Sequence, residues 1–107
     1  MSDLVSSIRE NYQQVLDQIA SAARRAHCDP NDVRLVVVTK SQPVEVAQAA
    51  MEAGVRILGE NYPEEAVLKI QSLAAQSGVE WHMIGHVQSR KARLVADHMH
   101  FYTPSTV

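Results

Sequence analysis

The chain contains very little cysteine and no long apolar segment. Cys28 is the only cysteine among 107 residues, so no internal disulfide can form, which is typical of proteins from a reducing compartment. No apolar run approaches the roughly 18 residues of a membrane-spanning helix, and the opening stretch MSDLVSSIRENYQQ is too charged for a signal peptide. A net charge of −2 and a pI of about 6.2 argue against general attraction to nucleic acid or anionic lipid. We therefore expect a soluble, cytoplasmic protein that binds neither nucleic acid nor membranes.

Glycine and proline are also scarce, with four of each, and most stand where the hydrophobic pattern changes. Apolar residues at three- and four-residue steps predict an amphipathic helix over residues 3–27, which Asp29-Pro30 ends. The β-branched run Val33–Thr39 predicts a short, fully buried strand. The same reasoning predicts further helices from Pro43 to Gly54, from Pro63 to about Gln76 and over 88–97, and further strands near 56–59, 80–84 and 99–102.

Strands that alternate with helices indicate right-handed βαβ units and a parallel sheet, so the fold class is α/β. Two architectures remain open from this spacing. A flavodoxin-like open sheet fits 107 residues, whereas a (β/α)8 barrel needs about 250 residues, so that this chain would be its first half. In either case we expect residues 1–107 to form one domain or part of one.

The carboxyl ends of the predicted strands carry polar residues beside glycines. They are Lys40, the Gly59-Glu60-Asn61 segment, Gly85-His86 and a Thr-Pro-Ser-Thr turn. Because active sites of α/β proteins gather at this end of the sheet, these residues indicate a site. Each also has a purely structural interpretation: Asn61 can cap the next helix, and His82 in WHMIG can be a core histidine.

Lys40 ends an apolar strand and has two interpretations. Its stem can cover apolar surface while the ammonium reaches water. Alternatively, a lysine between an apolar strand and a turn is poorly solvated, which favours the neutral amine and a Schiff base with a carbonyl. Alternation along the strand puts Lys40 on the same face as Val36 and Val38.

Histidines and basic residues give weaker signals. His82 and His86 straddle a strand end, and His98 and His100 lack a nearby third ligand, so we expect no metal site. Arg90, Lys91 and Arg93 fit a solvated helix face, or an anion site at the start of that helix.

Three motifs resemble those of one family. VVVTKSQP, GENYPEEAVLKI and WHMIGHVQSRKARLV occur in the order and spacing of the pyridoxal 5′-phosphate homeostasis proteins, also called the YggS-like or proline-synthetase co-transcribed family. The resemblance covers roughly residues 33–98. It implies the first half of a (β/α)8 barrel like that of the alanine racemase N-terminal domain, preceded by a helix.

The resemblance also implies the ligand and its contacts. Lys40 would hold the aldehyde of pyridoxal 5′-phosphate as an internal aldimine, with Asn61, His82 and Ile84 bordering the cofactor ring. Lys91 corresponds to a lysine near the mouth of the site. Members of the family are longer than this chain, and their later strands carry the segments that hold the cofactor phosphate. Where they usually have a Ser-Val-Asp-Ser turn, this chain reads YTPSTV.

Several functions follow from these residues. The resemblance favours a non-catalytic carrier that binds pyridoxal phosphate through Lys40 and passes it to apo-enzymes, with the intact protein a monomer. The runner-up is a racemase-like enzyme of the same barrel type, which needs a second base opposite the lysine. A cofactor-free Schiff-base aldolase and a degenerate interaction module are further alternatives. As a half-barrel, the chain alone should bind the cofactor poorly and self-associate through its uncovered strands.

Overall fold

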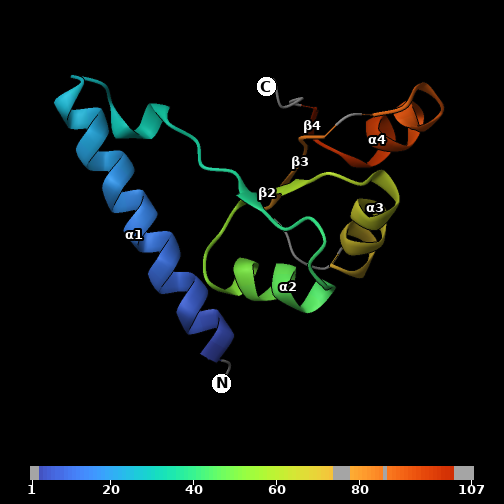
Figure 1. Cartoon of the computed structure of the whole chain (residues 1–107), viewed down its shortest axis with the longest axis horizontal. Coiled ribbons are helices and arrows are strands. Elements are labelled where there is room, and N and C mark those ends of the chain that lie inside the picture. The colour runs from blue at the N-terminus through green and yellow to red at the C-terminus, as the bar shows by residue number, and fades with distance from the viewer. Residues whose placement is uncertain (1–2, 74–77, 86, 103–107) are drawn as a thin grey trace.

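The computed structural model describes residues 3–73, 78–85 and 87–102, which form helices around a four-stranded sheet (Figure 1). The elements in chain order are α1 (Asp3–Arg25), η1 (Pro30–Asp32), β1 (Val37–Val38), α2 (Val44–Glu52), β2 (Ile57–Glu60), α3 (Pro63–Ser72), β3 (Glu80–Met83), η2 (Ser89–Lys91), α4 (Ala92–His98) and β4 (Phe101–Tyr102), where η marks a 3₁₀ turn. All pairings are parallel and the spatial order is β1-β2-β3-β4. The predicted α/β class with a parallel sheet is confirmed.

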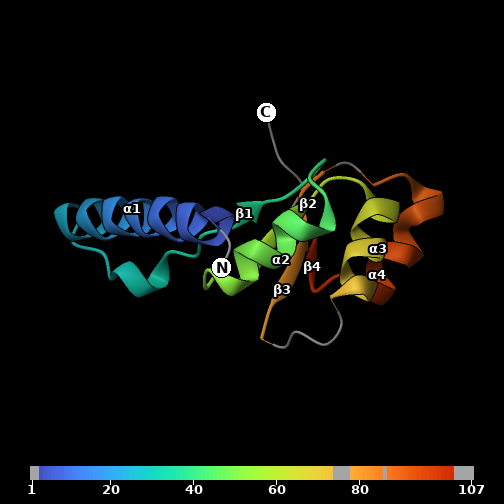
Figure 2. The ribbon, with the colours of Figure 1, turned by 90° about the horizontal axis from the view of Figure 1, so that it is seen from below.

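The helices are distributed unevenly about the sheet. α2, α3 and α4 follow one another around one side of it, whereas the long helix α1 extends away (Figure 1). α3 and α4 lie side by side at one end of the molecule, with α1 at the other (Figure 2). Val5 of α1 packs against Ala49 and Ala53, and Arg9 Nη2 donates to the carbonyl of Glu52 at 3.0 Å. α1 is therefore joined to the rest mainly through α2. None of the helices in the described part of the chain combines the length and apolar character needed to cross a membrane.

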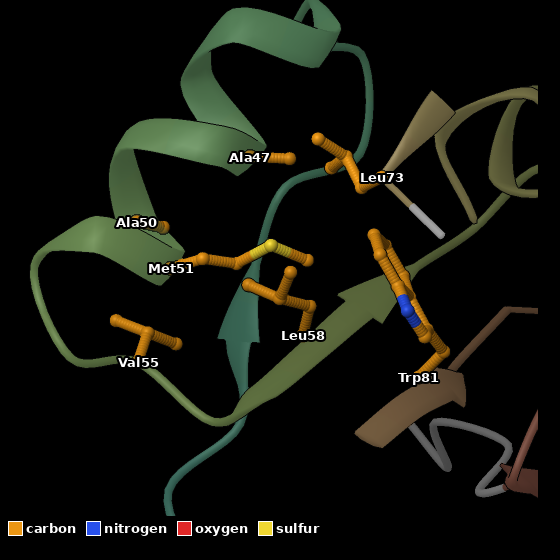
Figure 3. Packing of buried hydrophobic residues seen from close by; sticks show 7 residues of the cluster. All are labelled: Ala47, Ala50, Met51, Val55, Leu58, Leu73 and Trp81. Carbon is orange, nitrogen blue, oxygen red and sulfur yellow. The ribbon is translucent and has the colours of Figure 1, made fainter. Parts of the chain in front are cut away.

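The main core lies between α2 and the sheet. Leu58 of β2 is fully buried and lies between Met51 of α2 and Trp81 of β3 (Figure 3). The apolar face of α2 points toward this cluster, as the three- and four-residue spacing of its apolar residues predicts. The buried cluster comprises Ala47, Ala50, Met51, Val55, Leu58, Leu73 and Trp81.

The register divides the sheet into two faces. Val37, Leu58 and Trp81 are paired neighbours and belong to the core side, beneath the helices. The next row, Val38, Gly59 and His82, points the opposite way because successive side chains of a strand alternate. We call this second side the far face.

The first strand differs from its prediction. β1 covers only Val37–Val38 rather than residues 33–39, and Val33 and Val38 are 46% and 47% exposed. The expectation of a fully buried strand is therefore wrong. β1 is an edge strand with a single neighbour, and its Val38 lies on the far face, away from the helices.

Helix boundaries also differ in detail. α1 ends at Arg25, two residues early, where His27 takes a left-handed φ of 59°. The predicted 88–97 helix is divided into the η2 turn and α4. α3 ends at Ser72, and the remainder of its predicted range, together with the Thr-Pro-Ser-Thr turn, extends outside the described residues.

A charged contact ties the segment before β1 to β3. Arg34 Nη2 donates to Glu80 Oε1 at 2.5 Å, and His82 Nε2 lies 3.2 Å from the same oxygen. The hydrogen bond from Arg34, and then that from His82, hold the pKa of the Glu80 carboxyl below its ordinary value of 4.5. The exposed pair thus links the segment that leads into β1 to β3, which is not a neighbour of β1 in the sheet.

Two leucines allow a matched test of the core. Leu58→Ala should lower the free energy of unfolding by about 2–5 kcal/mol, because it leaves a cavity at a fully buried position. Leu68→Ala makes the same chemical change at a side chain that is 64% exposed, so its effect should stay within about 0.5 kcal/mol. Urea unfolding measures both values. Equal destabilisation by the two changes would contradict the described core.

The lowered pKa of Glu80 predicts a pH dependence. The folded chain holds this carboxyl ionised more strongly than the unfolded chain does, so its stabilising effect is present above the ordinary pKa and is lost as pH falls through the lowered one. Glu80→Gln should therefore lower the unfolding temperature at about pH 7, and the difference should shrink as pH falls below 4.5 and through the lowered pKa. The exposed Glu45→Gln serves as control. A Glu80→Gln effect independent of pH would refute the assignment.

Candidate functional site

The four predicted site residues lie on or beside one face of the sheet, toward its carboxyl end. Parallel bonding continues past the assigned strands, since Thr39 N donates to Gly59 O at 2.9 Å and Ile84 N to Glu60 O at 3.0 Å. Ile84 lies on the same face as Gly59 and His82, since its Cδ1 would be 3.2 Å from a Cβ at Gly59. Lys40 and Asn61 directly follow Thr39 and Glu60 at the ends of β1 and β2. The parallel sheet thus brings these four residues to its carboxyl end, with His82 and Ile84 on the far face.

Two glycines, Gly59 and Gly85, shape this face because they have no Cβ. A Cβ at Gly59 would lie 2.9 Å from Val36 Cγ1 and 3.2 Å from Ile84 Cδ1, so Val36 and Ile84 close over the bare backbone of Gly59. A Cβ at Gly85 would overlap the side chain of Asn61. The two glycines therefore allow an apolar floor at Gly59 and a close approach of the Asn61 carboxamide to the end of β3.

Asn61 and His82 have different surroundings. Asn61 does not cap α3, because the capping position is Tyr62 and no side chain bonds there, so the capping interpretation is wrong. His82 is 7% exposed and contacts Glu80 through its ring nitrogen, as a satisfied core histidine would. His82 thus combines burial with a place on the far face.

The three lysines of the sequence are in different states. Lys40 is exposed, and within the described residues its amine makes no hydrogen bond or ion pair. Lys91 forms an ion pair with Glu64, and Lys69 is 2% exposed and surrounded by acceptors. Lys40 is therefore the lysine whose amine is exposed and, within the described residues, has no counter-ion.

Lys69 forms a buried ion cluster that the sequence analysis missed. Its ammonium donates to Glu60 at 3.0 and 3.1 Å, to Glu65 Oε1 at 3.0 Å, and to the carbonyl of Thr39 at 2.6 Å. The Thr39 hydroxyl also donates to the Glu60 carboxylate. All three protons of the ammonium thus have acceptors, as a buried charge requires. The four-residue spacing of Glu65 and Lys69 on α3 was the available signal.

The turn after β1 is bound to this cluster. Glu65 Oε1 also accepts the Ser41 N–H at 2.8 Å, and Ser41 has a left-handed φ of 62°. The cluster occupies the helix side of the sheet, since Glu60 and Thr39 belong to the row that faces the helices. Lys40 therefore lies between two anchored neighbours, and its own side chain is exposed.

A pocket of about 440 Å³ opens beside the far face, where α3 begins. Asn61 and Lys91 both line it, which places Lys91 at an opening next to one predicted site residue. Lys91 belongs to the η2 turn rather than to an exposed helix, and it is partly buried. The full lining is Asn61, Tyr62, Pro63, Glu64, Gln88, Arg90 and Lys91.

Metal-ligating side chains do not gather in this part of the protein. Within residues 3–73, 78–85 and 87–102, no group of three His, Cys, Asp or Glu side chains lies together as a metal site needs. His98 Nδ1 lies 3.0 Å from the Leu94 carbonyl, and His100 Nδ1 accepts the Trp81 N–H at 2.9 Å. These two histidines therefore have structural partners.

Sequence comparison relates the chain to curated proteins. No family model matches it. It is 42% identical over 96 residues to the pyridoxal phosphate homeostasis protein of Escherichia coli, covering 88% of this chain and 41% of that protein. The corresponding protein of Vibrio alginolyticus is 40% identical over 97 residues, covering 88% and 42%. The chain spans about two fifths of the length of the curated relatives it matches.

Structural comparison agrees with the sequences. PipY of Synechococcus elongatus, in a structure with pyridoxal phosphate bound, superposes with a TM-score of 0.65 at 35% identity, covering 78% of this chain and 40% of PipY. A protein of unknown function from Bifidobacterium adolescentis superposes with a TM-score of 0.83 at 30% identity, covering 95% and 46%. By sequence and by fold, the chain is a relative of the pyridoxal phosphate homeostasis proteins that spans about two fifths of their length.

Proposed function

We propose that the chain binds pyridoxal 5′-phosphate through Lys40 and serves cofactor homeostasis without catalysis of its own. The names of its relatives and the cofactor bound to PipY support this function. The observation that carries it is the state of the three lysines: Lys69 and Lys91 are engaged by carboxylates, and Lys40 is exposed without a counter-ion in the described part of the chain.

The residues of the far face fit this cofactor. When bound, pyridoxal phosphate supplies an aldehyde carbon that a primary amine attacks, and Lys40 supplies that amine at a strand end. Ile84 and Val36, over the bare backbone of Gly59, offer apolar surface for a flat ring. Asn61 and His82 supply polar groups at the same face. These residues would hold the cofactor between an apolar floor and a polar border.

The surroundings of Lys40 favour a carrier over an enzyme. Acid–base chemistry on a bound cofactor needs a free proton donor or acceptor beside the lysine. The carboxylates bonded around its turn belong to Glu60 and Glu65, and both accept hydrogen bonds from Lys69. Glu65 also accepts the Ser41 N–H. Carboxylates bound in this way stabilise the turn and are poorly placed to exchange protons with a ligand.

We infer the fold, location and partners of the whole protein from its similarity to the pyridoxal phosphate homeostasis proteins. The three successive βα units and the fourth strand would form the first half of a (β/α)8 barrel. Residues 1–107 would be a single domain or the N-terminal part of one. The far face would then be the inside of the barrel. The protein would act in the cytoplasm, as a monomer when complete, and deliver the cofactor to apo-enzymes.

Trapping with borohydride tests the role of Lys40. Treatment of the chain with pyridoxal phosphate and then borohydride should leave a stable tag on Lys40, because its amine is accessible and lacks a counter-ion. Peptide mapping by mass spectrometry locates the tag. Lys40→Ala should abolish most of it, whereas Arg93→Ala, which removes a cation that is 93% exposed on α4, should retain it. A tag of equal yield in Lys40→Ala would show that the cofactor is held elsewhere.

The uncovered far face predicts self-association. Val38 is 47% exposed there, and β1 and β4 form the two edges of the sheet. We expect the mass measured by light scattering to rise with concentration, and cofactor titration by absorbance to report only weak binding. Val38→Lys should reduce the association, because it places a charge in the apolar surface. A monomer at every concentration with tight cofactor binding would contradict this expectation.

A further inference from the structure

Lys69 reaches from α3 to the turn that carries Lys40. Its Nζ donates to the Thr39 carbonyl at 2.6 Å, across a sequence separation of 30 residues. The same ammonium bonds to the carboxylates of Glu60 and Glu65. Because Lys69 is 2% exposed, water does not compete for these bonds, and the carbonyl that precedes Lys40 is held by a buried charge.

Glu65 holds the residue on the other side of Lys40. Its Oε1 accepts the Ser41 N–H at 2.8 Å and the Lys69 ammonium at 3.0 Å. Ser41 has φ 62°, in the left-handed region that residues with a side chain rarely adopt. The bond from Glu65 therefore stabilises a backbone conformation that Ser41 would not favour by itself.

We propose that Glu65 and Lys69 are positioning residues for Lys40. They anchor Thr39 and Ser41, so the backbone between them keeps one place while the Lys40 side chain remains exposed. An amine on an anchored backbone loses less freedom when it meets the aldehyde, so attachment is more favourable. Lys69 acts through the turn and not on the ligand. This role rests on the proposed function of Lys40.

Glu65 is a better position for substitution than Lys69, because its side chain is one-third exposed. Its removal also leaves the contact between Lys69 and Glu60 in place. Glu65→Ala deletes the acceptor for Ser41. Glu65→Gln removes the charge but keeps an oxygen that can accept both bonds. Glu45→Ala is the matched control: Glu45 lies in the first turn of α2, is exposed, and makes no hydrogen bond or ion pair within the described residues.

The first measurement needs no cofactor. Solvent exchange of the Ser41 amide, followed by NMR in the full chain, should accelerate about tenfold in Glu65→Ala, as expected for the loss of a bond to a charged acceptor. Glu65→Gln and Glu45→Ala should stay close to the unsubstituted rate. Thermal unfolding of each variant sets a temperature at which all remain folded. Unchanged exchange in Glu65→Ala would overturn the proposal.

The second measurement uses pyridoxal phosphate. The concentration that gives half-maximal borohydride tagging of Lys40 should rise about tenfold in Glu65→Ala, and Glu65→Gln should restore most of the difference. If Glu65 only stabilised the turn, Glu65→Ala would accelerate exchange of the Ser41 amide but leave the tagging of Lys40 unchanged. That result would also overturn the proposal. If Lys40 of the unsubstituted chain takes no tag, the proposed function fails. The exchange rates then decide alone whether Glu65 holds the turn.

Discussion

The burial of one ammonium group governs much of this structure. Lys69 is 2% exposed and Glu60 fully buried, and a charge in such a place is tolerated only when every proton finds an acceptor. The acceptors come from the end of β1, from β2 and from α3 itself. Removing one partner from a buried pair typically costs about 3–5 kcal/mol, so these segments are fixed relative to one another.

This constraint separates the two faces of the sheet. On the helix side, charges are buried and paired, and the aliphatic core packs beside them. The far face carries the exposed Val38 and the bare backbone of Gly59, and the exposed Lys40 follows at the end of β1. The structural lysine and the candidate ligand lysine thus lie near each other at the end of β1, the first buried and the second exposed. Their chemistry differs because only one of them is enclosed.

Some of this could be predicted from the sequence. Spacing of apolar residues located the α-helices and strands of the described residues, apart from some of their bounds, but not the two 3₁₀ turns. The position of Lys40 at a strand end led to the prediction of a site. The extent of β1 was not predictable, because an apolar residue such as Val33 does not show whether its strand has a neighbour on each side. The Lys69 cluster was missed for a related reason. Its partners Glu60 and Thr39 lie 9 and 30 residues away, and only the folded chain brings them together.

The order β1-β2-β3-β4 has a consequence for how the chain assembles in time. Each strand pairs with the one made just before it, so no contact in the sheet waits for a distant segment. The Lys69 cluster follows the same order, since its bonds all lie between residues 39 and 69. As the chain leaves the ribosome, β1, α2, β2 and α3 already contain every partner of that buried charge, and the turn around Lys40 can be set before β3 has emerged.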